Sequence, residues 1–313
     1  MAEYASTRSA FIAALLESGR KNTSIVVVSA DSESRYGEFV KEFPDRSFNV
    51  GISEQTMIGV AAGLALTGKT AVVTAYANFL AFRALEQIRV DIAAEKLDVK
   101  LVGTDTAFSA GWSGYTHLAL EDMAAIRALP NIVIVDPADG NEAFEATRAM
   151  FEYRGPVYIR LRGRQKDPVL PVLTRPFAIG RGEVLVEGKD VLIVACGSAV
   201  YESLKAASLL QAQGWSPAVV KMSTIRPLDG ELLLELTGRI QRVVTVEHHN
   251  IVGGLGSAVA EFMSEAGIGG RLLRLGVTNG FCRAGSEDML KKALSLDGEG
   301  IASAVSHFLL KEK

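Results

Sequence analysis

The stretch of sequence that decides the fold is residues 51–82, GISEQTMIGVAAGLALTGKTAVVTAYANFLAF. A small polar loop opens an unusually apolar, Gly- and Ala-rich segment, which predicts a helix over Gln55–Thr67 that is buried on most sides. The apolar, β-branched run at Ala71–Tyr76 predicts a buried strand, and a further helix is expected over Phe79–Glu95. A helix, a strand and a helix in this order are typical of an α/β protein with a parallel sheet.

The same alternation extends to both sides of this stretch. Short apolar runs predict further strands, at Ser24–Ala30, Asp98–Gly103, Asn131–Val135 and Val157–Leu161. Amphipathic stretches between them predict helices, at Ala5–Ser18, Ala119–Leu129 and Gly140–Glu152. Because strands that are apolar along their whole length are buried on both faces, we expect helices on both faces of a parallel sheet.

The alternation breaks once, at RGRQKDPVLPVLTRP (residues 162–176), where four Arg or Lys and three Pro residues show no periodicity. It then resumes with expected strands at Val191–Cys196, Ala218–Met222, Val243–Val246 and Leu272–Leu275. Expected helices follow at Ala199–Gln213, Gly230–Leu236, Ser257–Ala266, Glu287–Leu294 and Ile301–Leu310. We therefore predict an α/β fold of two consecutive three-layer domains, each a mostly parallel sheet with helices on both faces. The predicted domains are residues 1–165 and 177–313, joined by a linker at 166–176.

Length and composition narrow the class of protein. The chain has 313 residues, of which 48% are hydrophobic and 22% charged, so it is long enough for two globular domains. With 33 Lys and Arg against 36 Asp and Glu, it shows no basic patch, which argues against nucleic acid as a partner. Its apolar runs are too short for a membrane span, and its first residues lack the features of a signal peptide. Cys196 and Cys282 follow no metal-ligand or redox spacing, so we expect two reduced thiols in a cytoplasmic protein.

Two features of the deciding stretch could carry chemistry. Glu54 stands at the start of the apolar helix, where a carboxylate either caps the helix or serves as a functional acid in a desolvated setting. Tyr76, Phe79 and Phe82 follow at a strand-to-helix junction, which in parallel sheets is the end where ligands bind. The alternative interpretation of these three aromatic residues is packing in the core.

Two Gly-rich segments also stand at strand-to-helix junctions. SAGWSGYTH (residues 109–117) carries His117, which is either an acid, base or hydrogen-bond donor or an idle exposed side chain. EHHNIVGGLGS (residues 247–257) either cradles an anion or forms a purely structural turn. It does not contain G-x-G-x-x-G, so it does not indicate a dinucleotide site.

Taken together and in this order, these segments resemble the C-terminal half of transketolase over nearly the whole chain. GISEQ is similar to the family segment whose glutamate binds the aminopyrimidine ring of thiamine diphosphate, which implies that role for Glu54. YANFLAF resembles the aromatic wall around that ring, which implies Tyr76, Phe79 and Phe82. GWSGYTH resembles the family's GxDGPTH loop, so His117 stands at an active-site histidine that would donate to the substrate oxygen.

The resemblance also implies residues that bind substrate and cofactor. Arg8 resembles an arginine that contacts the sugar phosphate, and Asp31 resembles an aspartate that lies at the cofactor. Arg162 and Arg164 both lie near the family's second phosphate arginine, and the alignment does not choose between them. EHHNIVGGLGSAVAE looks like the family's C-terminal turn, which is not catalytic.

Three positions depart from the family pattern. Asp105 stands at or near the family's phosphate-site histidine, and an acid there would repel a phosphate. Ser113 replaces the aspartate of GxDGPTH that contacts the donor hydroxyl, and Tyr115 replaces its proline. These departures favour a related sugar, unphosphorylated or carrying another acid, as the donor.

The resemblance covers only half of a full transketolase. The diphosphate-binding domain is not part of this sequence, which implies a separate N-terminal subunit that holds the diphosphate and its Mg²⁺ or Ca²⁺, in an α₂β₂ assembly. No metal ligands are then expected on this chain, and the Gly- and Ala-rich helix should be buried against a second copy or the partner. The implied reaction is ketol transfer in carbohydrate metabolism such as the pentose phosphate reactions. The competing interpretations are the β subunit of a 2-oxoacid dehydrogenase, a 1-deoxyxylulose-5-phosphate synthase-like enzyme, and a non-catalytic regulatory subunit.

Overall fold

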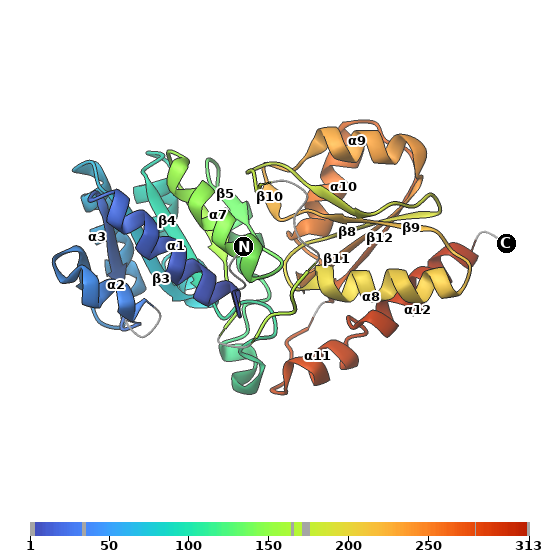
Figure 1. Cartoon of the computed structure of the whole chain (residues 1–313), viewed down its shortest axis with the longest axis horizontal. Helices are drawn as coiled ribbons and strands as arrows, with labels where there is room; N and C mark the ends of the chain where they lie inside the picture. The colour runs from blue at the N-terminus through green and yellow to red at the C-terminus, as the bar shows by residue number, and fades with distance from the viewer. Residues whose placement is uncertain (1–3, 33–35, 164–165, 171–175, 279, 312–313) are drawn as a thin grey trace.

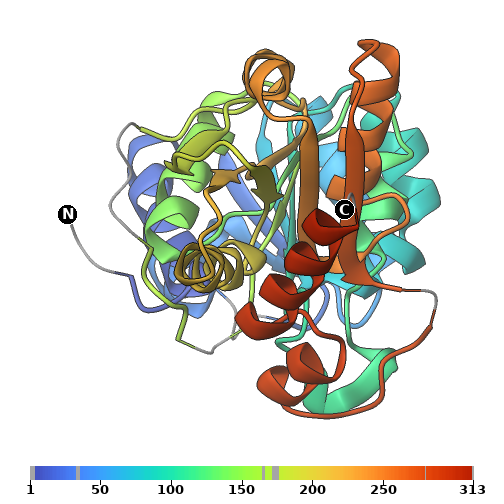
Figure 2. The same cartoon turned by 90° about the vertical axis from the view of Figure 1, so that its right-hand side faces the viewer.

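The computed structural model describes residues 4–32, 36–163, 166–170, 176–278 and 280–311. Two α/β domains lie side by side, the N-terminal one on the left and the C-terminal one on the right of Figure 1. Turned by 90°, the molecule presents its C-terminal domain in front of the N-terminal one (Figure 2). Each domain is built on its own mostly parallel sheet. The predicted fold class is therefore confirmed.

The first sheet has seven strands in the order β10-β5-β6-β4-β3-β1-β2. They are β1 (Ile25–Ser29), β2 (Ser47–Asn49), β3 (Thr70–Tyr76), β4 (Val99–Thr104), β5 (Val133–Val135), β6 (Val157–Arg160) and β10 (Thr224–Arg226). All neighbours are parallel except β10, which is antiparallel to β5. Because β1, β4, β5 and β6 are buried along their whole length, this sheet must be covered on both faces.

Helices cover the two faces of the first sheet. One face carries α1 (Thr7–Lys21) and α7 (Gly140–Glu152), whose first turns are capped by the side chains of Ser6 and Asp139. The other face carries α3 (Glu54–Leu66), α4 (Ala77–Arg83), α5 (Leu85–Gln87), the π-helical turn η3 (Ile88–Ala93) and α6 (Asp122–Arg127). The remaining elements are short: α2 (Gly37–Glu42), η2 (Pro44–Arg46) and η4 (Gly111–Thr116).

The second sheet has five strands in the order β12-β11-β8-β9-β7. They are β7 (Glu183–Val186), β8 (Val191–Ala195), β9 (Pro217–Lys221), β11 (Arg242–Asn250) and β12 (Arg271–Val277), with β7 antiparallel to β9. One face packs against α8 (Ala199–Ala212) and α12 (Gly298–Leu310), the other against α9 (Gly230–Arg239) and α10 (Leu255–Glu265). A further helix, α11 (Glu287–Ala293), lies below α8 in Figure 1.

A shared strand, and a backbone hydrogen bond beside a buried ion cluster of the first domain, join the two domains. β10 follows β9 of the second sheet in sequence yet pairs with β5 of the first. At the end of β6, Arg160 Nε lies 2.8 Å from Asp122 Oδ2, and its Nη1 lies 2.7 Å from Asp136 Oδ2. The backbone N–H of Gly197, from the second domain, donates to the carbonyl oxygen of Asp136 at 3.1 Å. The carboxyl ends of β6 and β8 are thereby held together.

Only part of the predicted linker lies within the described residues. Residues 171–175 of the expected range 166–176 lie outside the described residues. In the remainder, the buried Asp167 carboxylate accepts a 2.6 Å hydrogen bond from Thr7 N–H, and Leu170 N–H donates to Asp139 Oδ2 at 3.0 Å. Residues 166–170 are thus anchored to the first domain.

Most predicted helices begin or end one to three residues away from their expected bounds, and two differ for a clear structural reason. The helix expected over Phe79–Glu95 begins at Ala77 and is divided into α4, α5 and η3, because Ala84 leaves helical geometry (φ −112°, ψ 16°). The helix expected over Ala119–Leu129 begins at Asp122, because Ala119 forms β-bridges with residues 106 and 107. Strands β2, β7 and β10 were not predicted, since three or four residues are too few to show a periodic pattern.

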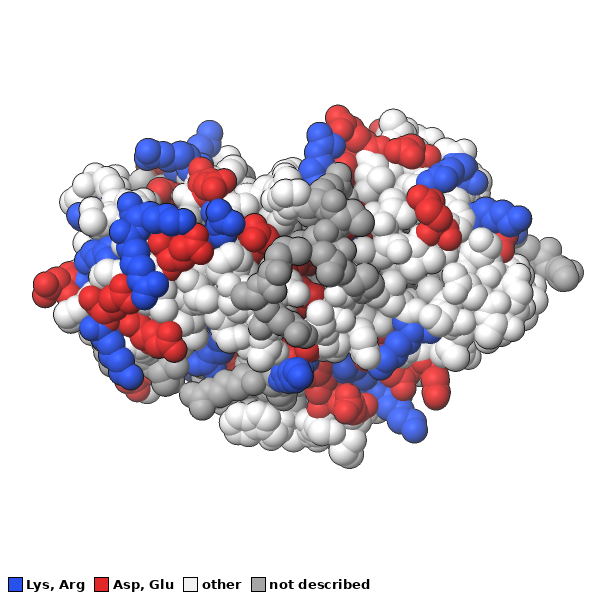
Figure 3. Space-filling model, in the orientation of Figure 1, with Lys and Arg blue, Asp and Glu red and all other residues white. Residues whose placement is uncertain are grey.

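Surface and thiols agree with a globular protein. Lys and Arg are interspersed with Asp and Glu on the face shown in Figure 3. Within the described ranges, no helix is long and apolar enough to cross a membrane. Cys196 and Cys282 are both buried and carry free thiols, as expected.

Candidate active site

Glu54 is the first residue of α3, at the carboxyl-end edge of the first sheet. A tight turn precedes the helix: Gly51 adopts φ +74°, a conformation that glycine tolerates best. Ser53 occupies the N-cap position without a side-chain cap hydrogen bond, and the Glu54 carboxylate accepts hydrogen bonds from the Arg83 side chain. The Glu54 side chain is only 6% exposed. The fold therefore holds a carboxylate in a largely desolvated place.

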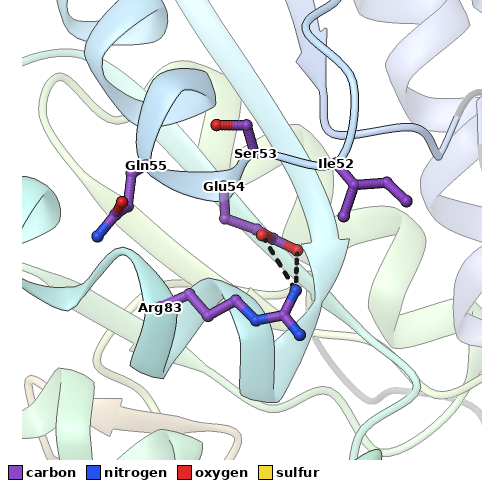
Figure 4. Close-up of a pocket in the computed structure, with 5 residues that line it drawn as sticks. All are labelled: Ile52, Ser53, Glu54, Gln55 and Arg83. Carbon is purple, nitrogen blue, oxygen red and sulfur yellow. Dashed lines mark hydrogen bonds and ion pairs between the residues drawn. The ribbon is translucent and has the colours of Figure 1, made fainter.

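The Glu54 carboxylate faces a pocket of about 400 Å³ lined by Ile52, Ser53, Glu54, Gln55 and Arg83. Arg83, the last residue of α4, reaches across this pocket (Figure 4). Its Nη1 lies 3.4 Å from both carboxylate oxygens of Glu54. Arg83 was not among the predicted site residues, although it follows Phe79 by four residues and so shares a helix face with it.

Three rings gather at the carboxyl end of β3. The rings of Tyr76 and Phe79 lie 5.5 Å apart, and each lies 5.2 Å from the imidazole of His117 in edge-to-face geometry. The Arg83 guanidinium lies 3.9 Å from the centroid of the Phe79 ring. Phe82 is on the same helix but is 50% exposed. The structure thus brings Tyr76, Phe79 and His117 together and leaves Phe82 at the surface.

Hydrogen bonds from both domains hold the loop that carries His117. Asn78 Nδ2 donates to the carbonyl oxygen of Thr116 at 2.7 Å, and Thr116 Oγ1 lies 2.9 Å from His117 Nδ1. At the start of η4, the Gly111 carbonyl accepts a 2.9 Å hydrogen bond from Gly285 N–H of the second domain. A Cβ on Gly111 would lie 2.5 Å from the Gly285 carbonyl oxygen, so this close approach requires glycine. Ser113 lies on η4, partly exposed.

Arg162 is already engaged by carboxylates of the chain itself. It is 7% exposed; its Nη1 pairs with Asp167, and its Nη2 lies 2.6 Å from Glu287 Oε2 of α11. Burial tends to raise the pKa of Glu287, but Arg162 and Lys291 more than offset this and lower it. Arg162 therefore ties the second domain to the first, and a substrate anion would have to compete with two carboxylates for it. Arg164 lies outside the described residues.

The other predicted substrate and cofactor residues lie at the start of a helix or at strand ends. Arg8 is buried in the first turn of α1, 7% exposed. Asp105 follows β4 with φ +59°, and its Oδ2 accepts a 2.9 Å hydrogen bond from Thr104 Oγ1. Asp31 follows β1 with φ +53° and is exposed, and its N–H donates to Asn49 Oδ1 at 3.1 Å. In the parts of the chain that the structure describes, no three or more His, Cys, Asp or Glu residues are grouped so that they could hold a metal ion.

The Gly-rich turn of residues 247–257 binds a carboxylate from its own chain. Glu247 is fully buried and accepts hydrogen bonds of 2.8 Å from the N–H groups of Leu255 and Gly256, at the start of α10. A Cβ on Gly254 would lie 1.8 Å from Glu247 Oε2, which explains the glycine. The helix N-terminus is therefore already occupied by an anion, and the turn is structural.

His248, in the same segment, makes stability depend on pH. Its Nε2 lies 3.3 Å from the Leu296 carbonyl and so donates, which leaves Nδ1 to accept from the Ser198 hydroxyl at 2.7 Å. Burial is the largest cause that lowers the pKa of His248, to about 3. Because the unfolded chain then binds a proton more readily, stability should be complete above pH 6.5 and fall as the pH drops towards 3, by up to ~1.4 kcal/mol per pH unit.

Urea unfolding of the wild type and His248→Gln at pH 7, 6, 5 and 4 measures this dependence. The difference in unfolding free energy between the two proteins should shrink as the pH falls. His307→Gln, at an exposed position on α12, is the control and should follow the wild-type pH profile. A constant difference between wild type and His248→Gln would show that this imidazole does not titrate differently on folding.

Comparison with known protein families and structures agrees with this architecture. The family model of the transketolase pyrimidine binding domain matches residues 3–166, and the family model of the transketolase C-terminal domain matches residues 180–301. The class of protein is thus a pyrimidine-binding domain followed by a transketolase C-terminal domain. Over 99% of its length the chain is 40% identical to a protein of Methanocaldococcus jannaschii, provisionally named a transketolase C-terminal section, of which it covers 98%.

Two further similarities point the same way. The chain is 40% identical to a protein of Actinobacillus succinogenes that is named as one subunit of an apulose-4-phosphate transketolase, over 90% of this chain and 91% of that one. A solved structure described as a split gene transketolase, inactive beta4 tetramer, superposes with a TM-score of 0.87 at 40% identity, covering 97% of this chain and 98% of that chain. The chain therefore belongs to the transketolase family, as a subunit made of its pyrimidine-binding and C-terminal domains.

Proposed function

We propose that this chain is the C-terminal subunit of a thiamine diphosphate-dependent transketolase, which moves a two-carbon ketol unit from a ketose to an aldose. It would be active only with a separate N-terminal subunit that holds the diphosphate and its Mg²⁺ or Ca²⁺. The single observation that carries this proposal is the buried Glu54 carboxylate, which Arg83 links to Phe79 in the cluster of the Tyr76, Phe79 and His117 rings. Relatives of the same length that are named as transketolase sections or subunits support the two-chain arrangement.

The residues at the carboxyl-end edge of the first sheet fit an aminopyrimidine ring. A flat heteroaromatic ring with a basic nitrogen needs a buried carboxyl group at that nitrogen and aromatic side chains around its faces. Glu54, 6% exposed, supplies the first, and Phe79 and Tyr76 supply the second. When bound, the cofactor supplies the electron sink for cleavage of a carbon–carbon bond beside a ketone.

The chain's own residues would then act in three ways. Glu54 would hold a proton at the ring nitrogen in a site shielded from water. Phe79 and Tyr76 would orient the ring by stacking, worth ~0.5–1.5 kcal/mol beyond the area they bury. His117, held by Thr116, would donate a hydrogen bond to the substrate oxygen as negative charge develops there.

The exposed face of α3 supports assembly with another chain. Leu66 is 72% exposed and Ile52, just before the helix, is 75% exposed. Nothing lies within 4 Å of a Cβ built on Gly59 or Gly63, so this face of an otherwise apolar helix is open to close packing. We therefore expect α3 to be buried against a second copy or the partner chain in an α₂β₂ enzyme.

The proposal leaves the donor open between sugars and sugar phosphates. Arg162 is already paired with Asp167 and Glu287, which supports a donor without a phosphate at this place. The relative named for apulose-4-phosphate supports a phosphorylated one, for which Arg8 and Arg164 are the remaining candidates. Donors of both kinds therefore belong in the test.

Reconstitution with the N-terminal subunit tests the function. Ketol transfer should appear only when both chains, thiamine diphosphate and Mg²⁺ are present, and neither chain alone should show it. Light scattering should then give a mass of two copies of each chain, and an active 1:1 pair would overturn the α₂β₂ assembly. Consumption of a 2-oxoacid without ketol transfer from any ketose would instead support the dehydrogenase or synthase interpretation. No reaction with any donor, despite cofactor binding, would point to the regulatory subunit.

A further inference from the structure

The Glu54 carboxylate and the Phe79 ring share one partner, Arg83. Its Nη1 lies 3.4 Å from both oxygens of Glu54, while its guanidinium carbon lies 3.9 Å from the Phe79 ring centroid. Among the described residues, Arg83 alone forms a hydrogen bond or ion pair with this carboxylate. Figure 4 shows the guanidinium below the carboxylate, between α4 and the start of α3.

These contacts fill the places that the proposed function gives to the cofactor. A guanidinium stacked on an aromatic face lies at the same separation as a stacked heteroaromatic ring, so the two cannot share that face of Phe79. Both oxygens of Glu54 are likewise directed at Arg83 rather than at an open position. An aminopyrimidine that binds here must therefore first separate Arg83 from Glu54 and Phe79.

The two members of the pair differ in their freedom to move. The Glu54 side chain is 6% exposed and fixed at the start of a helix, whereas the Arg83 side chain is 51% exposed at the end of α4. A long side chain that is half in water can turn outward at small cost, whereas a buried carboxylate without a partner is costly. Arg83 is therefore the member that leaves.

We propose that Arg83 is a built-in competitor of the cofactor, a positioning residue that occupies Glu54 and Phe79 until the aminopyrimidine displaces it. It satisfies a buried carboxylate in the cofactor-free chain and reduces the fraction of molecules that are ready to bind. The apparent dissociation constant then equals the intrinsic one divided by that fraction. This proposal rests on the proposed function of the same site, and it adds a residue that sets cofactor affinity.

Calorimetric titration of thiamine diphosphate, with Mg²⁺, into the assembled two-chain protein tests it. Arg83→Gln should bind the cofactor about threefold to tenfold more tightly than the wild type, the range expected from losing one half-exposed ion pair and one cation–π contact. Arg83→Lys, which keeps the charge without the flat guanidinium, should fall between them. Arg20→Gln is the matched control, because Arg20 is 61% exposed and pairs with Glu42 on α2, far in sequence from the pocket. The affinity of Arg20→Gln for thiamine diphosphate should equal that of the wild type.

A double mutant separates competition from a general structural effect. In a Glu54→Gln background the ion pair is already lost, so the gain from Arg83→Gln should become clearly smaller. Equal or weaker cofactor binding by folded Arg83→Gln would overturn the proposal, and weaker binding would make Arg83 a cofactor ligand. If Arg83→Gln does not fold, Arg83→Lys decides between the same outcomes. Absence of binding by the wild-type pair would instead refute the proposed function, so the two failures are distinguishable.

Discussion

Replacement of Glu54 by Gln in the two-chain enzyme is expected to lower the rate of ketol transfer by at least about 10²-fold, the loss typical of a positioned acid or base. Gln keeps the size and one carbonyl oxygen of the side chain but has no carboxyl proton to share with the ring nitrogen. The rate loss should persist at saturating cofactor, because it arises from proton handling and not from cofactor occupancy. Steady-state rates at rising thiamine diphosphate concentration measure it.

A matched substitution distinguishes this loss from damage to a helix start. Glu38 also stands in the first turn of a helix, α2, but it is exposed there. Glu38→Gln should therefore keep the wild-type rate, and both variants should keep the wild-type midpoint of thermal unfolding within a few degrees. Near-normal turnover by Glu54→Gln at saturating cofactor would show that Glu54 takes no part in the catalytic steps.

Much of the fold could be predicted from the sequence because the central strands are buried on both faces. Val26–Val28 and the residues of β4 and β6 are buried without interruption, and such runs can form only the middle of a covered sheet. The pairing of β10 with β5 could not be predicted, since three residues carry no periodic signal and their partner lies about ninety positions earlier. Long-range pairing of short edge strands depends on where the domains meet, which no local pattern records.

The candidate site was predictable where its residues are close in sequence. Tyr76 and Phe79 stand on one strand-to-helix junction, and the turn of the chain there brings their rings together. The pairing of Arg162 with Asp167 and Glu287 was not foreseen, because Glu287 is 125 positions away on α11. Arg83 had a local signal, the four-residue spacing from Phe79 on a helix, but its contact with Glu54 depends on how α3 and α4 pack.

Replacement of Arg160 by Met is expected to have the largest effect on stability. Arg160 is 2% exposed and bridges Asp122 and Asp136, and Tyr158 donates a 2.5 Å hydrogen bond to Asp122. Burial tends to raise the pKa of Asp122, yet the guanidinium more than offsets this and lowers it, so the carboxyl group is held ionised. Met fills the space but leaves two buried carboxyl groups without their cation, which should cost ~3–5 kcal/mol.

Urea unfolding of the full chain at pH 7 measures this cost, with Arg239→Met as the control. Arg239 is 49% exposed and pairs with a 72% exposed Glu187 at 3.3 Å, so water can replace its partner and little stability should be lost. Adding Asp122→Asn to Arg160→Met should recover part of the loss, because it removes one of the two carboxylates that the substitution strands. If Arg160→Met were as stable as Arg239→Met, the ion cluster around Arg160 would make no measurable contribution to the free energy of unfolding. The loss and its partial recovery together would show that the Arg160 cluster, which lies in the first domain beside the hydrogen bond from Gly197 of the second, stabilises the fold by charge.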